Sequence, residues 1–133
     1  MSKARFIKDV KVSERHGAGE WTAERLSALI LVPLTLWALW GAAQVAGEGY
    51  EGATAWLVQP VNAALVAALW LVSLWHMNMG MKVVVDDYIH RPASRLTLLG
   101  LSSLFCLVLA AAGVFFIARV ALGSEPMPAG FGV

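Results

Sequence analysis

The sequence predicts an all-α membrane protein with three transmembrane helices, because it is very apolar and contains three long apolar runs. Of its 133 residues, 59% are hydrophobic and only 14% are charged, which is too apolar for a soluble domain of this size. A helix that crosses the hydrocarbon core of a bilayer takes about 20 residues. Three stretches have this length, and we expect the helices at about 25–46, 60–84 and 95–122.

These runs make up most of the chain, so we expect one membrane-anchor domain over residues 1–133. This domain begins with a cytoplasmic N-terminal segment, residues 1–24. No short apolar core follows the basic start, and no cleaved secretory signal is therefore expected. The only cysteine, Cys106, lies in the third run, which excludes an intrachain disulfide and a thiol-based metal site.

The distribution of positive charge predicts how the helices cross the membrane. Six of the ten Lys and Arg residues precede the body of the first helix, and Lys82, Arg91 and Arg95 lie at or in the second connection. The first connection, residues 47–59, has none. By the positive-inside rule the N-terminus lies in the cytoplasm and the C-terminus in the periplasm. The basic N-terminal segment either attracts anionic lipid or contacts a soluble partner protein, and no nucleic-acid partner is expected.

His76 lies about fifteen residues into the second apolar run, where an ionisable group is costly and usually has a partner. Gly80 follows one helical turn later, and Asp87 follows after three turns plus roughly 20°, so all three share one face of a helix. A neutral imidazole is a good axial ligand for haem iron, and a glycine beside it admits a flat ligand. The alternative is that His76 only hydrogen-bonds a Ser or Thr on another helix.

A second axial ligand would have to come from another membrane chain, because His16 and His90 lie in polar segments. Asp87 and Tyr88, at the end of the same helix, offer a carboxylate and a phenol that can exchange protons at the membrane surface. Such groups suit the reduction of a quinone, which needs hydrogen-bond donors and a route for protons. The alternative is an ordinary helix end with an interfacial tyrosine.

Two stretches resemble the smaller hydrophobic anchor subunit of succinate dehydrogenase, respiratory complex II. The first, "HMNMGMKVVVDDYIH", is similar to that family's pattern of His, three residues, Gly, six residues and Asp-Tyr. The second, "GAGEWTAERLSALILVPLTLW", resembles the start of its first helix, with Trp21, Arg25 and Ser27 in their places. With the three-helix plan, the resemblance spans nearly the whole chain.

The resemblance implies particular roles for these residues. His76 would be the axial ligand of haem b, Tyr88 the residue that hydrogen-bonds the quinone, and Asp87 the carboxylate beside it. Arg25 would lie near the haem propionates, with Ser27 as a weaker candidate. Relatives often have a histidine where this chain has Glu20, so either His16 takes over that polar contact or this part of the haem pocket differs.

The resemblance also implies an assembly. This chain would form half of a heterodimeric helical bundle with a second hydrophobic anchor subunit of the cytochrome b type, and would hold an iron-sulfur subunit and a flavoprotein subunit at a bacterial inner membrane. Succinate would be oxidised in the flavoprotein, and no activity is expected from the isolated chain. The alternatives are the anchor of a fumarate reductase working in the reverse direction, or a non-redox three-helix transporter or assembly subunit.

Overall fold

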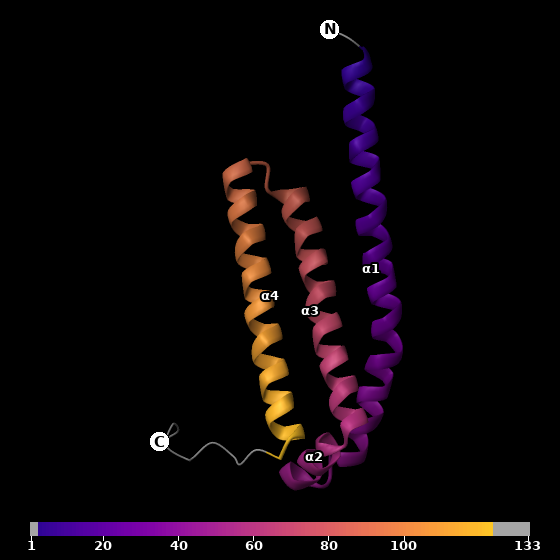
Figure 1. Ribbon diagram of the computed structural model, residues 1–133, viewed down its shortest axis with the longest axis vertical. Helices are drawn as coiled ribbons and strands as arrows, with labels where there is room; N and C mark the ends of the chain where they lie inside the picture. The colour runs from indigo at the N-terminus through magenta and orange to yellow at the C-terminus, as the bar shows by residue number, and fades with distance from the viewer. Residues whose placement is uncertain (1–2, 124–133) are drawn as a thin grey trace.

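The computed structural model of the protein consists of four helices: α1 (Lys3–Val45), α2 (Gly49–Val58), α3 (Pro60–Tyr88) and α4 (Pro92–Ala121) (Figure 1). It describes the backbone of residues 3–123 and the side chains from Gly17 onward. No strand occurs in the described backbone. The predicted all-α class is therefore confirmed.

Three of the helices are long and apolar enough to cross a membrane. These are the stretch Gly17–Val45 of α1, the whole of α3 and the whole of α4, each of 29 or 30 residues. The helix α1 also continues back through the polar segment that we expected to precede it, and it continues through Pro33. Charged side chains are good helix formers in water, so a spanning helix can extend beyond the apolar run that anchors it.

Prolines mark where α3 and α4 begin. Pro60 and Pro92 are the first residues of their helices, where the missing N–H would have no partner in any case. Only residues 89–91 separate α3 from α4. The residue before each proline has an extended backbone, as proline requires of its predecessor. The short turn makes α3 and α4 antiparallel neighbours.

The short helix α2 was not predicted. It begins at Gly49, whose φ of +65° suits a residue without a side chain. Its Trp56 stacks on Trp37 of α1, with ring centroids 5.3 Å apart. A side chain at Gly41 would overlap the Trp56 indole, so this glycine lets the ring approach α1 closely. Asn62 of α3 donates a hydrogen bond to the Trp56 carbonyl at 2.9 Å.

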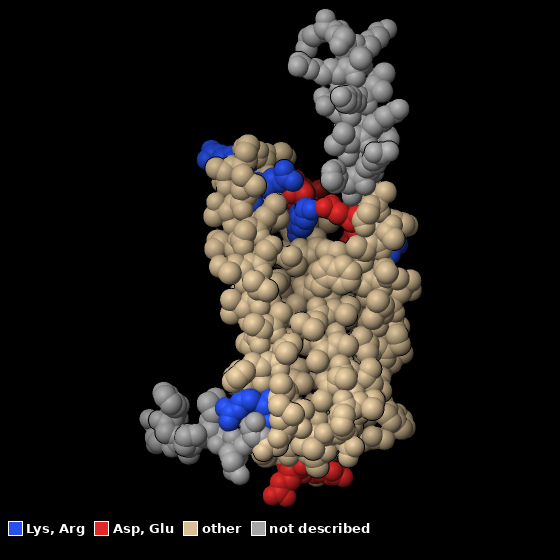
Figure 2. Space-filling view, viewed as in Figure 1, with Lys and Arg blue, Asp and Glu red and all other residues tan. Residues whose placement is uncertain are grey.

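The long helices form a row with α3 in the middle. Both α1 and α4 pack against α3, whereas the described parts of α1 and α4 do not contact each other. Figure 1 shows the turn between α3 and α4 at one end of the row and α2 at the other. We call these the α3–α4 end and the α2 end. Figure 2 shows charged side chains at both ends and a belt of other residues between them, as a membrane protein requires.

Contacts between α3 and α4 combine close packing with hydrogen bonds. The indole Nε1 of Trp70 donates to the carbonyl of Leu109 at 3.0 Å. A Cβ at Gly113 would overlap that same indole, so the glycine makes the approach possible. Further along, Asn78 Oδ1 lies 3.4 Å from the hydroxyl of Ser102 and 3.3 Å from that of Ser103. Small residues and polar pairs of this kind hold membrane helices together.

Few side chains are buried within the row itself. In the described part of the chain, the buried apolar residues are Ala63, Leu74, Val85 and Cys106, and the only buried polar residue is Ser27. Most of the apolar surface therefore faces outward, toward lipid or toward other chains.

Candidate functional site

The one fully buried polar side chain among the described residues lies beside His76. Ser27 of α1 has a relative exposure of 0%, and its Oγ lies 2.8 Å from Nδ1 of His76 on α3. The same Oγ donates a hydrogen bond to the carbonyl oxygen of Glu24, also at 2.8 Å. The imidazole is partly buried at this contact. This polar pair therefore joins two helices within their membrane-spanning parts.

Gly80 lies one turn beyond His76 on the same face of α3. Apart from its chain neighbours and the backbone of its own helix turn, no described atom lies within 4 Å of the position that a Cβ would take there. Among the described side chains, the imidazole of His76 makes only the hydrogen bond to Ser27, through Nδ1. The second ring nitrogen, Nε2, thus has no partner among the described residues, and open space lies one turn away along the helix.

Asp87 and Tyr88 lie at the end of α3, and neither contacts His76. The helix runs without a break from Pro60 to Tyr88, so Asp87 lies on the face of His76, roughly 16 Å further along the axis. Tyr88 is turned by about 120° from that face and is 77% exposed. Neither side chain makes a hydrogen bond or ion pair with another described residue.

Arg25 lies near the same end of the molecule but not against the imidazole. Its guanidinium stacks over the ring of Trp21, at 4.5 Å from the centroid. It lies two residues before Ser27, which places it about 200° around α1 from the face that meets α3. Its side chain is exposed and makes no ion pair with another described residue.

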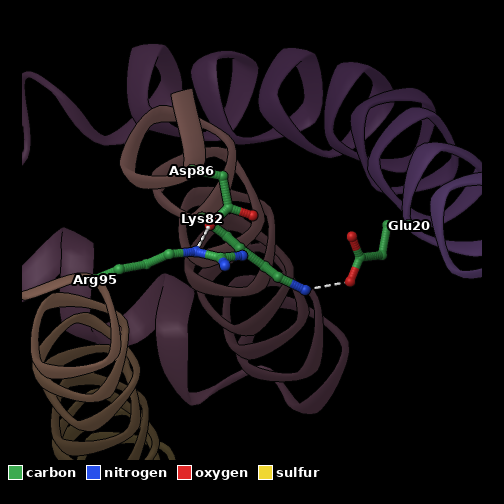
Figure 3. Close-up of polar contacts among 4 residues, drawn as sticks. All are labelled: Glu20, Lys82, Asp86 and Arg95. Atoms are coloured by element: carbon green, nitrogen blue, oxygen red, sulfur yellow. Dashed lines mark hydrogen bonds and ion pairs between the residues drawn. The ribbon is translucent and has the colours of Figure 1, made fainter. Parts of the chain in front are cut away.

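Two ion pairs join the three long helices at the α3–α4 end (Figure 3). Lys82 of α3 pairs with Glu20 of α1, and Arg95 Nε of α4 donates to Asp86 Oδ1 of α3 at 2.6 Å. The charge of Glu20 is therefore balanced by a lysine of α3. Of the two adjacent acids on α3, Asp86 is engaged in this structural contact, while Asp87 is not.

An apolar groove lies on the other side of His76, toward the α2 end. It has a volume of about 630 Å³. Its walls come from all three long helices and consist of Thr35, Val66, Leu69, Trp70, Ser73, Gly113, Phe116 and Ile117. None of the residues predicted for the site lines it.

Several predictions fall on parts of the chain outside this description. The side chains before Gly17, which include His16 and the basic residues from Lys3 to Arg15, are not described. Residues 124–133 are likewise outside the described range. The proposed contact of His16 and the location of the C-terminus therefore stay predictions.

The alternative drawn from the sequence expected a hydrogen bond from His76 to a Ser or Thr of another helix, and the structure shows this bond with Ser27. Sequence reasoning named Ser27 without pairing it with His76, and it missed both ion pairs. A usable signal was present for the first contact: within residues 26–45 the polar side chains are Ser27, Thr35 and Gln44, and only Ser27 lies near the cytoplasmic end at which His76 was placed. The ion pairs join residues of different helices, so their partners depend on how those helices are rotated.

Comparison with known proteins agrees with this architecture. The model of the family described as "Succinate dehydrogenase/Fumarate reductase transmembrane subunit" matches residues 5–119. The chain is 29% identical over 97 residues to the succinate dehydrogenase hydrophobic membrane anchor subunit of Rickettsia conorii, covering 72% of this chain and 77% of that one. It is 23% identical over 88 residues to the succinate dehydrogenase membrane anchor subunit of Reclinomonas americana, covering 64% and 73% of the two chains.

No solved structure matches the chain. The family model nevertheless covers the first two membrane-spanning helices, nearly all of the third and every residue predicted for the site. The resemblance to the succinate dehydrogenase anchor is thereby confirmed, and the chain belongs to the family of succinate dehydrogenase and fumarate reductase transmembrane subunits.

Proposed function

We propose that this chain is the hydrophobic membrane anchor of a succinate:quinone oxidoreductase, in which His76 holds haem b and the end of α3 contributes to the quinone site. The observation that carries the proposal is the open space at Gly80, one turn from an imidazole whose Nε2 has no partner among the described residues. The succinate direction is favoured over fumarate reduction because the curated relatives are succinate dehydrogenase subunits.

The residues around His76 fit a haem better than a bare metal ion. No group of three or more His, Cys, Asp or Glu side chains that could hold a metal occurs among the described residues. A haem brings four nitrogen ligands of its own and needs only axial ligands from protein. His76 would hold the haem iron through Nε2, and a second anchor subunit would supply the other protein ligand. Bound there, the iron would supply a one-electron redox centre.

Arg25 is the cation that we assign to a haem propionate. Its guanidinium is exposed, makes no ion pair with another described side chain and lies on α1 within one turn of Ser27. Guanidinium groups form strong paired hydrogen bonds with carboxylates. Glu20 does not oppose this assignment, because Lys82 balances its charge.

The quinone would be bound by the exposed end of α3. The phenol of Tyr88 donates a hydrogen bond to a quinone carbonyl oxygen and stabilises the negative charge that develops there during reduction. Asp87 accepts a hydrogen bond from the phenol or passes protons from the aqueous side. Both side chains are exposed in this chain, so surfaces of other subunits complete the pocket.

The assembly follows from the same proposal. A second anchor subunit covers the outward apolar faces, and an iron-sulfur subunit and a flavoprotein subunit dock at the α3–α4 end. The membrane is a bacterial inner membrane, with that end in the cytoplasm and the C-terminus in the periplasm. Electrons from succinate then reach the quinone at the cytoplasmic side, and the isolated chain has no activity of its own.

The haem assignment is tested by optical spectra of the purified complex. His76→Ala should remove most of the b-type absorption bands, because it deletes an axial ligand. His90→Ala is the matched control, since His90 lies exposed in the turn after α3, and should leave the bands unchanged. Undiminished bands in the His76→Ala complex would show that another residue holds the haem.

The quinone assignment is tested by two assays on one preparation. Tyr88→Phe should slow quinone reduction by about 10- to 100-fold, because a hydrogen bond to a charged group contributes roughly 1.5–3 kcal/mol. Succinate oxidation by an artificial dye should not change. Tyr50→Phe is the control, since this second exposed tyrosine lies in α2 at the opposite end. Equal loss of both activities in Tyr88→Phe would contradict the assignment.

A further inference from the structure

The hydroxyl of Ser27 has two neighbours but only one proton to donate. One neighbour, the carbonyl oxygen of Glu24, can only accept a hydrogen bond, and Ser27 donates to it across 2.8 Å. A serine in a helix commonly bonds a carbonyl of the preceding turn in this way. The other neighbour is Nδ1 of His76, also at 2.8 Å. Because the serine proton is already used, the hydrogen bond to His76 requires a proton on Nδ1.

We propose that Ser27 is a positioning residue that holds His76 in the tautomer with its proton on Nδ1, so that Nε2 keeps its lone pair for the haem iron. This inference rests on the proposed haem function. A neutral imidazole carries one N–H, and the hydrogen bond at one nitrogen decides whether the other is free to bind a metal. Ser27 thus selects the ligating nitrogen without contacting the iron.

The surroundings of Ser27 make this hydrogen bond hard to replace. Ser27 is fully buried, so water does not reach its hydroxyl. No other described side chain bonds the imidazole. The contact also joins residues that are 49 positions apart in the chain, so the tautomer depends on the correct pairing of α1 with α3. When the Ser27 oxygen accepts a hydrogen bond from Nδ1–H, the imidazole becomes a better electron donor to a metal.

The first test measures haem properties in the intact complex. Ser27→Ala should weaken haem retention by about 10- to 100-fold, the usual effect of removing the partner of a ligating histidine. It should also raise the midpoint potential of the haem, because a less basic imidazole stabilises the ferric state less well. The oxidised haem should show altered EPR g values, since the ring loses its fixed orientation. Ser27→Thr keeps a hydroxyl and should restore all three properties.

Two controls separate positioning from general packing. Ser27→Val has nearly the shape of Ser27→Thr without the hydroxyl, so the pair isolates the hydrogen bond. Thr35→Val removes a hydroxyl from α1 at a residue that lines the apolar groove and should leave the haem unchanged. If His76→Ala loses the haem while Ser27→Ala and Ser27→Val keep the wild-type potential and g values, Ser27 has no positioning role but the haem assignment stands.

The second test measures the tautomer directly and does not depend on haem or on assembly of the variants. The full chain is labelled with ¹⁵N-histidine and studied by NMR in detergent micelles, with His76 assigned from the signal that His76→Ala lacks. We expect a protonated Nδ1 and an unprotonated Nε2. A proton on Nε2 would overturn the inference, whatever the variants do to the complex.

Discussion

At the scale of single residues, the arrangement around His76 depends on the side chain of Ser27 and on the absence of a side chain at Gly80. Ser27 is fully buried, and its hydroxyl lies against Nδ1 of the imidazole. Gly80 leaves the helix surface bare one turn away. A serine contact is enough to satisfy a histidine in a membrane helix, but it does not by itself require a glycine nearby. A bare surface one turn from the imidazole is what the proposed haem requires.

The role of Gly80 leads to a direct prediction. Gly80→Leu should be tolerated by the chain itself, because nothing in the described structure lies where the new side chain begins. It should nevertheless reduce haem occupancy severalfold, since the leucine occupies the surface beside His76. Haem content per complex is the measurement.

The control for Gly80→Leu is Gly100→Leu, because Gly100 of α4 also has open space at its Cβ position. Both variants should insert into the membrane to the same extent. Normal haem content in Gly80→Leu would mean that the ligand does not approach this face of α3.

The shared face of His76, Gly80 and Asp87 could be predicted because the information lay within one helix. The spacing of His76, Gly80 and Asp87 needs only a helical repeat, and α3 is indeed continuous across them. The contact with Ser27 needs the relative depth and rotation of two helices, which spacing along one chain does not determine. The same limit applies to the Lys82–Glu20 ion pair.

At the scale of helices, α3 and α4 are held together by the indole of Trp70, which packs against Gly113. Trp70 donates to a backbone carbonyl of α4, and Gly113 provides the room. In a membrane, lipid competes for apolar surface, so close approach and interhelical hydrogen bonds contribute more to specificity than hydrophobicity does. This contact defines the distance between two spanning helices.

A methyl group at Gly113 should therefore destabilise the α3–α4 pair. Gly113→Ala should lower the thermal midpoint of the purified complex, because overpacking of a close contact typically costs about 1–3 kcal/mol. Gly100→Ala, on the same helix but with open space around it, should have little effect.

A double substitution tests the cause. Trp70→Phe shortens the ring that overlaps the new methyl, so combining it with Gly113→Ala should cost less stability than the two single changes added together. Additive losses would mean that the glycine matters for another reason.

The helical class was predictable because three apolar runs have the length of a bilayer, whereas α2 was not. Its residues, Gly49–Val58, lie in a connection with glycines at 47, 49 and 52, a composition typical of a loop. What makes this segment a packed helix is tertiary: Trp56 stacks on Trp37, and Asn62 bonds the Trp56 carbonyl.

At the scale of the whole molecule, the charge distribution predicts the orientation of the row in the membrane. The α3–α4 end carries Lys82, Arg91 and Arg95. At the other end α2 contains Glu51 and no basic residue, and the one basic residue described there is Arg119 in the last turn of α4. On the face drawn in Figure 2, the charged groups lie at or near these two ends. The positive-inside rule then predicts that the α3–α4 end lies in the cytoplasm.

Cysteine labelling tests this orientation. In a Cys106→Ala background, Glu51→Cys should react with a membrane-impermeant maleimide in spheroplasts, because α2 faces the periplasm. His90→Cys, which lies in the turn between α3 and α4, should react only after the membrane is permeabilised. The opposite pattern would invert the topology and move the quinone site to the periplasmic side.

The central position of α3 has a consequence for how the protein is made. Each contact between spanning helices joins two that follow one another along the chain, α1 with α3 and α3 with α4. A ribosome delivers these segments to the membrane in that same order. Every newly inserted span therefore finds its neighbour already in place, and the row can be completed by adding helices at one edge, without an earlier pair having to separate.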